Sequence, residues 1–376
     1  EPFSDIIINF LDSLSKELIK NKNSKDYPDV VTFAFFCRKA NLISLKNQYY
    51  NKNELRLGRG LIFHIAPSNV PVNFAYSMVV GLLSGNMNIV RLPSKKFDQV
   101  NIISNVIKFL ITNSIYKKIS NYITLIRYDR SSNHTNYFSS ISDVRIIWGG
   151  DLTINEIRKN KLPPRSFDLT FADRYSLCII NADKYLNYFD KNKVAKSFYN
   201  DTYLFDQNAC TSPHLIIWTG KKKNVIKSKK LFWDHLEILV NENYPIQSII
   251  SVDKLTSFYK QSISMEDISK EVSGNNLLWR VNINDLDENI HDYKCSSGYF
   301  NEYYASSISE INKIINRKYQ TLSYFGYSHN KLRKIMLDLK PIGIDRIVPI
   351  GKTTDFSLTW DGYNLIEILS RKIDIT

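Results

Sequence analysis

The feature that most constrains the fold is an alternation of short apolar runs with longer segments of helical period, which begins at residue 61. Residues 61–66 and 88–92 predict strands, and residues 72–84 between them predict an apolar helix that ends before Gly85. The pattern continues with helices predicted at 98–111 and 152–159 and strands at 122–127, 144–148 and 176–180. Strands that alternate with helices favour a parallel sheet covered on both faces, and such sheets bind ligands beyond the carboxyl ends of their strands.

The length of 376 residues suggests two or three domains at roughly 150 residues each. We predict an α/β fold with a helical lead-in (1 to about 55) joined to a first domain (1–196), a second α/β domain (197–340), and a last segment (341–376) that returns to the first domain or forms an oligomer interface. The second block carries predicted strands at 214–218, 277–281, 298–304 and 322–327 and predicted helices at 190–203, 309–316 and 331–339.

The charge balance is strongly basic, with 50 Lys and Arg against 37 Asp and Glu and a net charge of +13. This fits a nucleic acid, an anionic membrane or a phosphorylated ligand. The basic residues are dispersed, and the densest group, between Lys221 and Lys230, follows Gly220 as a solvated helix would, so we expect no nucleic acid. No apolar run reaches the roughly 18 residues of a membrane span and no secretory pattern opens the chain, so we expect a cytoplasmic protein.

The four cysteines are widely separated, which argues against a metal cluster. Cys37 and Cys178 lie in apolar runs and are predicted to be core residues, but Cys210 lies in the polar segment 206–212, where a reactive thiolate is useful. His214 follows four residues later, yet it starts an apolar run and is more simply a residue at a strand end than a partner of Cys210. His64, inside a predicted strand, is expected to be a hydrogen-bonded core histidine.

Phosphate signatures are weak in this chain. Residues 351–353 read Gly-Lys-Thr, but Arg346 replaces the glycine that a P-loop needs, and no GxGxxG follows a strand. Gly149 and Gly150 lie between a predicted strand and a predicted helix, where bare N–H groups favour an anion. An ordinary tight turn explains this pair equally well.

The segment 65–72 joins a predicted strand to a predicted helix and contains two prolines. Between them, Asn69 offers an amide donor from a stiff frame, which suits the stabilisation of an oxyanion. The simpler interpretation is that Ser68 or Asn69 caps the following helix, with Pro71 in its first turn. Local sequence favours the cap.

Several of these motifs together resemble a known family. The runs 58–74 (GRGLIFHIAPSNVPVNF) and 81–86 (GLLSGN), with 207–213 (QNACTSP), 345–351 (DRIVPIG) and 360–362 (WDG), are similar to LuxC-type acyl-CoA reductases, which form long-chain aldehydes and belong to the aldehyde dehydrogenase superfamily. The resemblance covers residues 55 to 376. It implies an NADP-binding domain, a catalytic domain and a small oligomerisation element, and therefore a homo-oligomer.

The resemblance also implies roles for individual residues. Cys210 aligns with the cysteine nucleophile and Asn69 with the asparagine that holds the oxyanion. The positions implied to contact the cofactor are Pro67, Ser68, Arg91, Ser94, Lys95, Gly149 and Gly150. No metal is implied.

Two departures from the superfamily pattern are informative. Thr170 stands where acid-forming members carry a glutamate that activates water, so an acyl-enzyme here should persist until a thiol or a hydride reaches it. Lys95, followed by Lys96, stands where NAD-preferring members carry a glutamate, and a lysine attracts the 2′-phosphate of NADPH.

We therefore expect NADPH-dependent reduction of an acyl-CoA, or of an acyl group delivered by an acyl-protein synthetase-like partner, to an aldehyde through a thioester on Cys210. Three alternatives stay open at this point: a CoA-independent aldehyde dehydrogenase that releases an acid, a non-catalytic acyl-binding relative, and a basic nucleic-acid binder. Product analysis, acyl labelling of Cys210 and a salt-sensitive gel shift would separate them.

Overall fold

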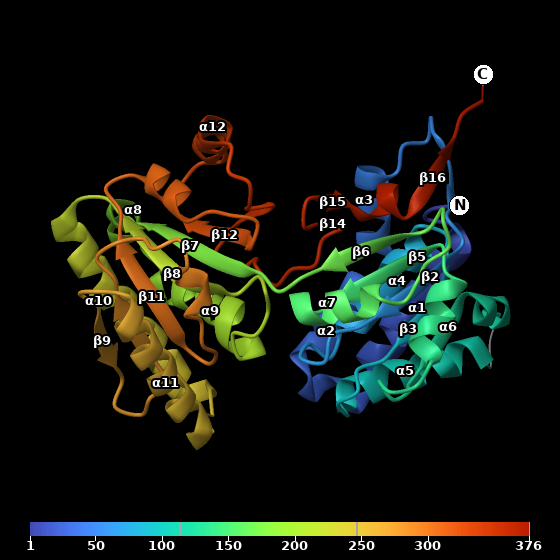
Figure 1. Ribbon diagram of the computed structural model, residues 1–376, viewed down its shortest axis with the longest axis horizontal. Coiled ribbons are helices and arrows are strands. Elements are labelled where there is room, and N and C mark those ends of the chain that lie inside the picture. The colour runs from blue at the N-terminus through green and yellow to red at the C-terminus, as the bar shows by residue number, and fades with distance from the viewer. Residues whose placement is uncertain (113–114, 246, 376) are drawn as a thin grey trace. The chain divides into compact units, whose positions relative to one another are not determined.

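The structure, a computed structural model, describes residues 1–112, 115–245 and 247–375. It contains two compact units (Figure 1). Unit 1 comprises Glu1–Asp173 and Phe356–Thr376, and unit 2 comprises Arg174–Asp355.

Unit 1 is built on a five-stranded sheet in the order β4-β3-β2-β5-β6, and every pair of neighbours is parallel. The strands are β2 (Leu61–Ile65), β3 (Met87–Arg91), β4 (Ile123–Ile126), β5 (Val144–Trp148) and β6 (Phe167–Phe171). The connecting helices are α4 (Asn73–Leu83), α5 (Asp98–Thr112), α6 (His134–Ser140) and α7 (Asp151–Arg158), with the 3-10 segment η2 (Lys117–Tyr122). The predicted parallel sheet is therefore confirmed.

Helices cover both faces of this sheet, as the sequence predicts. Ile154 and Ile157 of α7 and Phe138 of α6 pack with Phe63 and Ile65 of β2 in one apolar cluster. On the other side, α4 packs against β2 and β3 and against α1. Because both faces are covered, the strands of this sheet are apolar almost throughout.

The N-terminal lead-in is helical and belongs to unit 1. It contains α1 (Asp5–Lys20), η1 (Lys22–Asp26), α2 (Pro28–Phe36) and α3 (Lys39–Tyr49). The apolar residues of α1 are buried from Ile7 onward, whereas Ile6 is 46% exposed.

The C-terminal segment returns to unit 1 and pairs with a strand there. The strand β1 (Leu55–Gly58) pairs antiparallel with β16 (Ser370–Ile373). Before β16 come β14 (Thr359–Trp360), β15 (Tyr363–Asn364) and the short helix α13 (Leu365–Ile368). Asp361 and Gly362, both in the left-handed region at φ 47° and 77°, form the turn between β14 and β15.

Unit 2 contains a seven-stranded sheet in the order β13-β12-β7-β8-β11-β10-β9, parallel except for the edge strand β9. The strands are β7 (Tyr175–Asn181), β8 (Pro213–Thr219), β9 (Ser269–Val272), β10 (Trp279–Asn282), β11 (Tyr299–Tyr304), β12 (Tyr319–Phe325) and β13 (Arg346–Pro349). The helices are α8 (Ala182–Asn187), α9 (Lys191–Thr202), α10 (Lys222–Asn243), α11 (Ser248–Ser264) and α12 (His329–Leu339), with 3-10 segments η3 (Tyr203–Phe205), η4 (Ile290–Asp292) and η5 (Ile308–Lys313).

Side chains of this sheet alternate between two apolar clusters, one on each face. Leu177 and Ile179 of β7 enter the first cluster, and Cys178 and Ile180 enter the second. The prediction that Cys178 is a core residue is confirmed, and burial raises the pKa of its thiol.

The unit boundaries differ from those predicted. The division falls at 173/174 rather than 196/197, because β7 hydrogen-bonds to β8 and β12 in the sheet of unit 2. The return to unit 1 begins at residue 356 rather than 341, because β13 pairs with β12. The strand β6 and the helices α6 and α11 were not predicted, and the predicted helix at 309–316 is the 3-10 segment η5.

Candidate functional site

The strand order of unit 1 creates a switch point between β2 and β5. From β2 the chain continues through α4 to β3 on one side, and from β5 it continues through α7 to β6 on the other. The loops that follow β2 and β5 therefore diverge at the carboxyl edge of the sheet. Open parallel sheets bind nucleotides in the crevice that such a divergence leaves.

The loop after β2 carries Pro67, Ser68 and Asn69. Ser68 and Asn69 are exposed, and the helix α4 begins only at Asn73, with Val72 as its N-cap and no side-chain cap bond. The interpretation of Ser68 or Asn69 as a helix cap is therefore wrong. The functional interpretation, an amide donor on a loop stiffened by prolines, stays a prediction.

The turn after β5 holds the two predicted glycines in different ways. The Gly149 N–H donates to the carbonyl of Phe171 at 3.1 Å, so β6 already uses this amide. A Cβ at Gly149 would lie 3.3 Å from Thr153 Cγ2, whereas one at Gly150 would meet nothing within 4 Å. Gly150 is the N-cap of α7 and is the open position of the pair.

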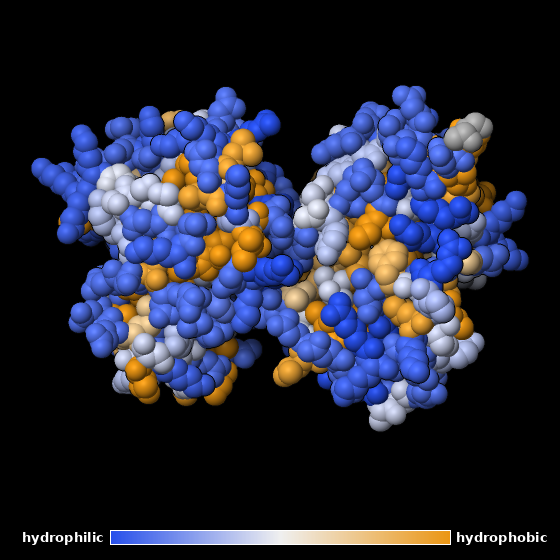
Figure 2. All heavy atoms as spheres, turned by 45° about the horizontal axis from the view of Figure 1, so that its top comes forward, coloured by the Kyte–Doolittle hydropathy of each residue, from blue (hydrophilic) through white to orange (hydrophobic). Residues whose placement is uncertain are grey.

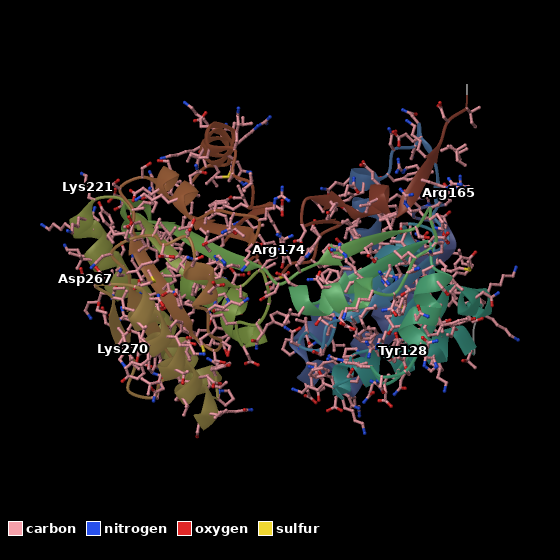
Figure 3. All side chains as sticks on the ribbon, in the orientation of Figure 1. Tyr128, Arg165, Arg174, Lys221, Asp267 and Lys270 are labelled. Carbon is pink, nitrogen blue, oxygen red and sulfur yellow. The ribbon has the colours of Figure 1, made fainter. Side chains whose placement is uncertain are left out.

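The segment after β3 carries Arg91, Ser94 and Lys95. The Arg91 guanidinium lies 4.6 Å from the ring centroid of Tyr128, the residue labelled in Figure 3. Ser94 and Lys95 are exposed, and Lys95 Nζ lies 5.1 Å from the ring centroid of Phe97. Ile65 and Arg91 are directly opposite in the β2–β3 ladder, so this segment lies beside the loop that carries Asn69.

A buried network of polar side chains joins the strands and the helix around the switch point. His64 contacts Ser77 Oγ through Nδ1 (2.8 Å) and Asn88 Oδ1 through Nε2 (2.9 Å), and Trp148 Nε1 donates to Ser77 Oγ (3.1 Å). These bonds join β2, α4, β3 and β5. Burial lowers the pKa of His64 to about 4, so the ring is neutral at pH 7, and the prediction of a hydrogen-bonded core histidine is confirmed.

In unit 2, Cys210 is half-buried in the turn that precedes β8. Its carbonyl accepts a hydrogen bond from Ser176 Oγ at 2.6 Å, and Ser176 follows the unit boundary by only three residues. Cys210 therefore lies at the amino ends of β7 and β8, the edge at which the chain enters unit 2.

The Cys210 turn is held by Gln207, which the sequence analysis did not single out. This side chain is 1% exposed and makes four hydrogen bonds. Nε2 donates to the carbonyls of Pro213 and Tyr299, both at 3.0 Å, and Oε1 accepts from the N–H groups of Gly298 (2.9 Å) and Tyr299 (3.1 Å). Gln207 thus ties the turn to β8 and β11 and is a hydrogen-bond partner for four backbone groups.

Asp201, at the end of α9, was also missed. Its carboxylate accepts from the N–H of Gly351 (2.6 Å) and of Thr353 (3.0 Å), and its carbonyl accepts from Ser212 Oγ (2.8 Å). Burial raises the pKa of Asp201 to about 6. The Gly-Lys-Thr segment thus binds the protein's own carboxylate through two amides.

His214 and the other cysteines lie in buried or half-buried surroundings of their own. Cys37 is buried, as predicted, and Cys295 is half-buried in the loop before β11. His214 is 6% exposed at the start of β8 and its ring stacks on Tyr175. Burial lowers the pKa of His214 to about 3, as expected for a neutral strand-end residue.

Neither a metal-binding cluster nor a membrane-spanning helix occurs among the described residues. No group of three or more His, Cys, Asp or Glu side chains in this part of the chain is placed to hold a metal ion. No helix within the described ranges combines the length and apolar character needed to cross a bilayer.

Comparison with known families and sequences gives two matches. A sequence model of the acyl-CoA reductase (LuxC) family matches residues 38–371. The long-chain acyl-protein thioester reductase of Vibrio harveyi is 23% identical over 313 residues. That match covers 79% of this chain but 60% of the relative, so this chain spans less than two thirds of the relative's length.

Solved structures share the fold at low sequence identity. The glyceraldehyde-3-phosphate dehydrogenase of Methanocaldococcus jannaschii, complexed with NADP, aligns over 98% of this chain and 88% of its own at 12% identity, with a TM-score of 0.67. Aldehyde dehydrogenase 21 of Physcomitrella patens aligns over 98% and 85% at 10% identity, with a TM-score of 0.70. The expected aldehyde dehydrogenase-like α/β fold is therefore confirmed.

Proposed function

The chain belongs to the acyl-CoA reductase (LuxC) family, and on this premise we propose that it reduces an acyl thioester to an aldehyde with NADPH, using Cys210 as nucleophile. The observation that carries the proposal is the Cys210 turn. Its thiol is half-buried rather than sealed in the core, and Gln207 and Ser176 hold the backbone around it. A nucleophile on a rigid turn loses little entropy when it attacks.

The chemistry proceeds in two halves. The Cys210 thiolate attacks the thioester carbonyl carbon, and the negative charge moves to the carbonyl oxygen, where the Asn69 amide and the Cys210 N–H donate hydrogen bonds. The C–S bond to the donor thiol then breaks, which leaves an acyl group on Cys210 and releases the donor as a thiolate. NADPH, when bound, supplies a hydride to that acyl carbon. Collapse of the resulting hemithioacetal frees Cys210 and the aldehyde.

The cofactor assignment rests on the carboxyl edge of unit 1. Its switch point and the open position at Gly150 suit a dinucleotide, and the exposed Lys95 provides a cation for a 2′-phosphate. In Lys95→Glu we expect the preference for NADPH over NADH, measured as the ratio of kcat/KM values, to fall about 10-fold or more, because the carboxylate repels the phosphate. An unchanged ratio would remove Lys95 from the cofactor site.

The acyl donor is proposed by analogy with the V. harveyi relative, whose name describes reduction of an acyl-protein thioester. The donor here is a CoA thioester or a thioester on a partner enzyme. The net charge of +13 suits CoA, which carries several phosphates. We further propose a cytoplasmic homo-oligomer.

The test is a panel of acyl-CoAs of increasing chain length incubated with the protein and NADPH. We expect loss of NADPH absorbance and an aldehyde product, and without NADPH a Cys210-bound acyl group detected by intact-protein mass spectrometry. A carboxylic acid product would favour an aldehyde dehydrogenase reaction that releases acid, which Thr170 disfavours. Absence of any acyl adduct with every donor would contradict the proposal.

A further inference from the structure

Helix α11 of unit 2 buries two polar side chains, and Phe258 beside them packs against the core of the unit. The residues of this helix that are fully buried are Lys254 and Gln261. Lys254 Nζ donates to the carbonyl of Asn276 at 2.8 Å, and Gln261 accepts from Tyr299 OH (2.9 Å) and donates to Asn301 Oδ1 (2.8 Å). Burial lowers the pKa of Lys254 to about 8. These bonds fix the rotation of the helix about its own axis.

The opposite side of α11 is apolar and exposed. Ile249, Val252, Tyr259 and Ile263 are 59%, 56%, 56% and 86% exposed, and Leu255 lies beside them at 36%. We call these five residues the α11 stripe. Figure 2 shows a largely hydrophilic surface in which exposed apolar atoms gather in patches. An amphipathic helix of a monomer normally turns most of its apolar residues to the core, whereas α11 turns only Phe258 to the core and exposes the stripe, which indicates that another surface covers the stripe.

The spacing of the stripe specifies the kind of surface that fits it. Ile249, Val252, Thr256, Tyr259 and Ile263 follow one another at intervals of three and four, which is the a and d pattern of a two-heptad coiled-coil seam. Lys254 and Gln261 then occupy the f positions, directly opposite the seam. The complement of such a seam is a second helix with the same repeat.

Charges beside the seam point to a second copy of α11 in antiparallel orientation. Asp253 and Lys260, both exposed, occupy the two e positions. If a two-fold axis passes through Thr256, Asp253 of each copy lies beside Lys260 of the other, and Ile249 lies opposite Ile263. A parallel arrangement makes no pair of opposite charges at these positions. We propose that the α11 stripe is a homodimer interface in which two copies of α11 pack antiparallel.

Neighbouring contacts leave the seam accessible. Lys270 of β9, labelled in Figure 3, lies 4.7 Å and 5.6 Å from the ring centroids of Phe258 and Tyr259. This contact orients the Tyr259 ring, which remains more than half exposed. The proposal is independent of the reaction assigned to Cys210.

The first experiment measures the mass of the full chain by sedimentation velocity over a range of concentrations. We expect a dimer or a larger even oligomer for the unmodified chain, and halved mass for Val252→Asp combined with Tyr259→Asp. The matched control is Ile226→Asp on α10, where the side chain is 65% exposed but lies outside the stripe, and it should leave the mass unchanged. A monomeric unmodified chain, or an oligomer that survives the double substitution, would overturn the proposal.

The second experiment tests self-pairing by charge reversal. Lys260→Glu places Glu beside Asp253 of the other copy, so the dissociation constant should rise by about 3- to 10-fold, in line with exposed charge pairs. Asp253→Lys combined with Lys260→Glu restores both pairs and should restore the original affinity. Failure of the double reversal to restore association, while far-UV circular dichroism shows an intact fold, would mean that a different protein occupies the stripe.

Discussion

The two loops that carry the proposed catalytic residues are built in contrasting ways. The loop with Asn69 projects from the carboxyl end of β2, and both Ser68 and Asn69 are exposed. The turn with Cys210 is hydrogen-bonded to three strands. Gln207 bonds it to β8 and β11, and Ser176 bonds it to β7. Asn69 depends on two prolines for its stiffness, whereas Cys210 depends on hydrogen bonds that buried side chains donate and accept.

The difference has a physical reason. Asp206 and Gln207 both adopt the left-handed region, at φ 50° and 59°, which costs backbone energy at non-glycine positions. The surrounding bonds must therefore hold the turn in place. A prolyl loop needs no such support, because the ring itself restricts φ.

Removal of the sulfur is the largest expected effect. In Cys210→Ala we expect kcat for aldehyde formation to fall by at least about 10⁴-fold, as for other enzymes that lose a covalent nucleophile. Cys295→Ala is the matched control, since Cys295 is also half-buried in unit 2, and it should retain activity. Aldehyde formation at an undiminished rate in Cys210→Ala would eliminate the scheme.

Removal of the amide in the prolyl loop should have the next largest effect. In Asn69→Ala we expect kcat to fall by about 10²–10³-fold, the cost of losing one oxyanion donor, with little change in the folding midpoint because the side chain is exposed. The control is Asn101→Ala on α5, another exposed asparagine. A change in KM alone would indicate substrate binding rather than oxyanion stabilisation.

Gln207→Glu tests the hydrogen-bonded turn with an almost isosteric change. Loss of Nε2 leaves the carbonyls of Pro213 and Tyr299 without their donor, at a cost of roughly 1–3 kcal/mol for each buried group. We expect a lower urea midpoint and faster alkylation of Cys210 by iodoacetamide. An alkylation rate equal to that of the unmodified chain would show that Gln207 does not position the thiol.

The smallest expected effect concerns Asp201 and pH. Because burial raises its pKa from 3.8 to about 6, the folded state holds the proton more tightly than the unfolded state between these values. Asp201 therefore lowers the free energy of unfolding as pH rises through this window. In Asp201→Asn we expect this contribution to the free energy of unfolding to vanish. The urea midpoint of the unmodified chain should therefore fall more between about pH 4 and pH 7 than the midpoint of the variant does. Identical pH profiles would contradict the assigned titration.

Much of the fold follows from local pattern. Apolar runs of strand length, helices of period 3.6 and Gly85 after a helix specify the β2-α4-β3 unit, and the structure has these elements within two residues of the prediction. The strand β6 was missed because its residues read Phe-Asp-Leu-Thr-Phe, where Asp168 interrupts the apolar run. Asp168 is tolerated because it pairs with the buried Arg145, with 2.7 Å between Arg145 Nε and Asp168 Oδ1. That partner lies 23 residues away, beyond any local window.

The residues of the candidate site also fall into those that the sequence revealed and those that only the structure revealed. Cys210 stands out in the amino-acid sequence because it lies in a polar loop, whereas the roles expected of Asn69 and Gly150 come from the resemblance to the family, since local sequence explains these two residues equally well or better as a cap and a turn. Gln207 carries no such signal, because an amide in a polar loop looks like any solvated residue. Its partner on β11, Tyr299, is 92 residues further along the chain.

By itself, then, the sequence determined the two α/β blocks, the family and the identity of the candidate nucleophile, because periodicity and motif chemistry are properties of neighbouring residues. Tertiary structure alone decided where the units divide, which side chains hold the Cys210 turn, and that α11 exposes most of its apolar residues. Those outcomes depend on hydrogen bonds between distant segments, such as those that pair β7 with β12 and the one that Tyr299 OH donates to Gln261. Such bonds form only once the chain has folded, and no local pattern encodes them.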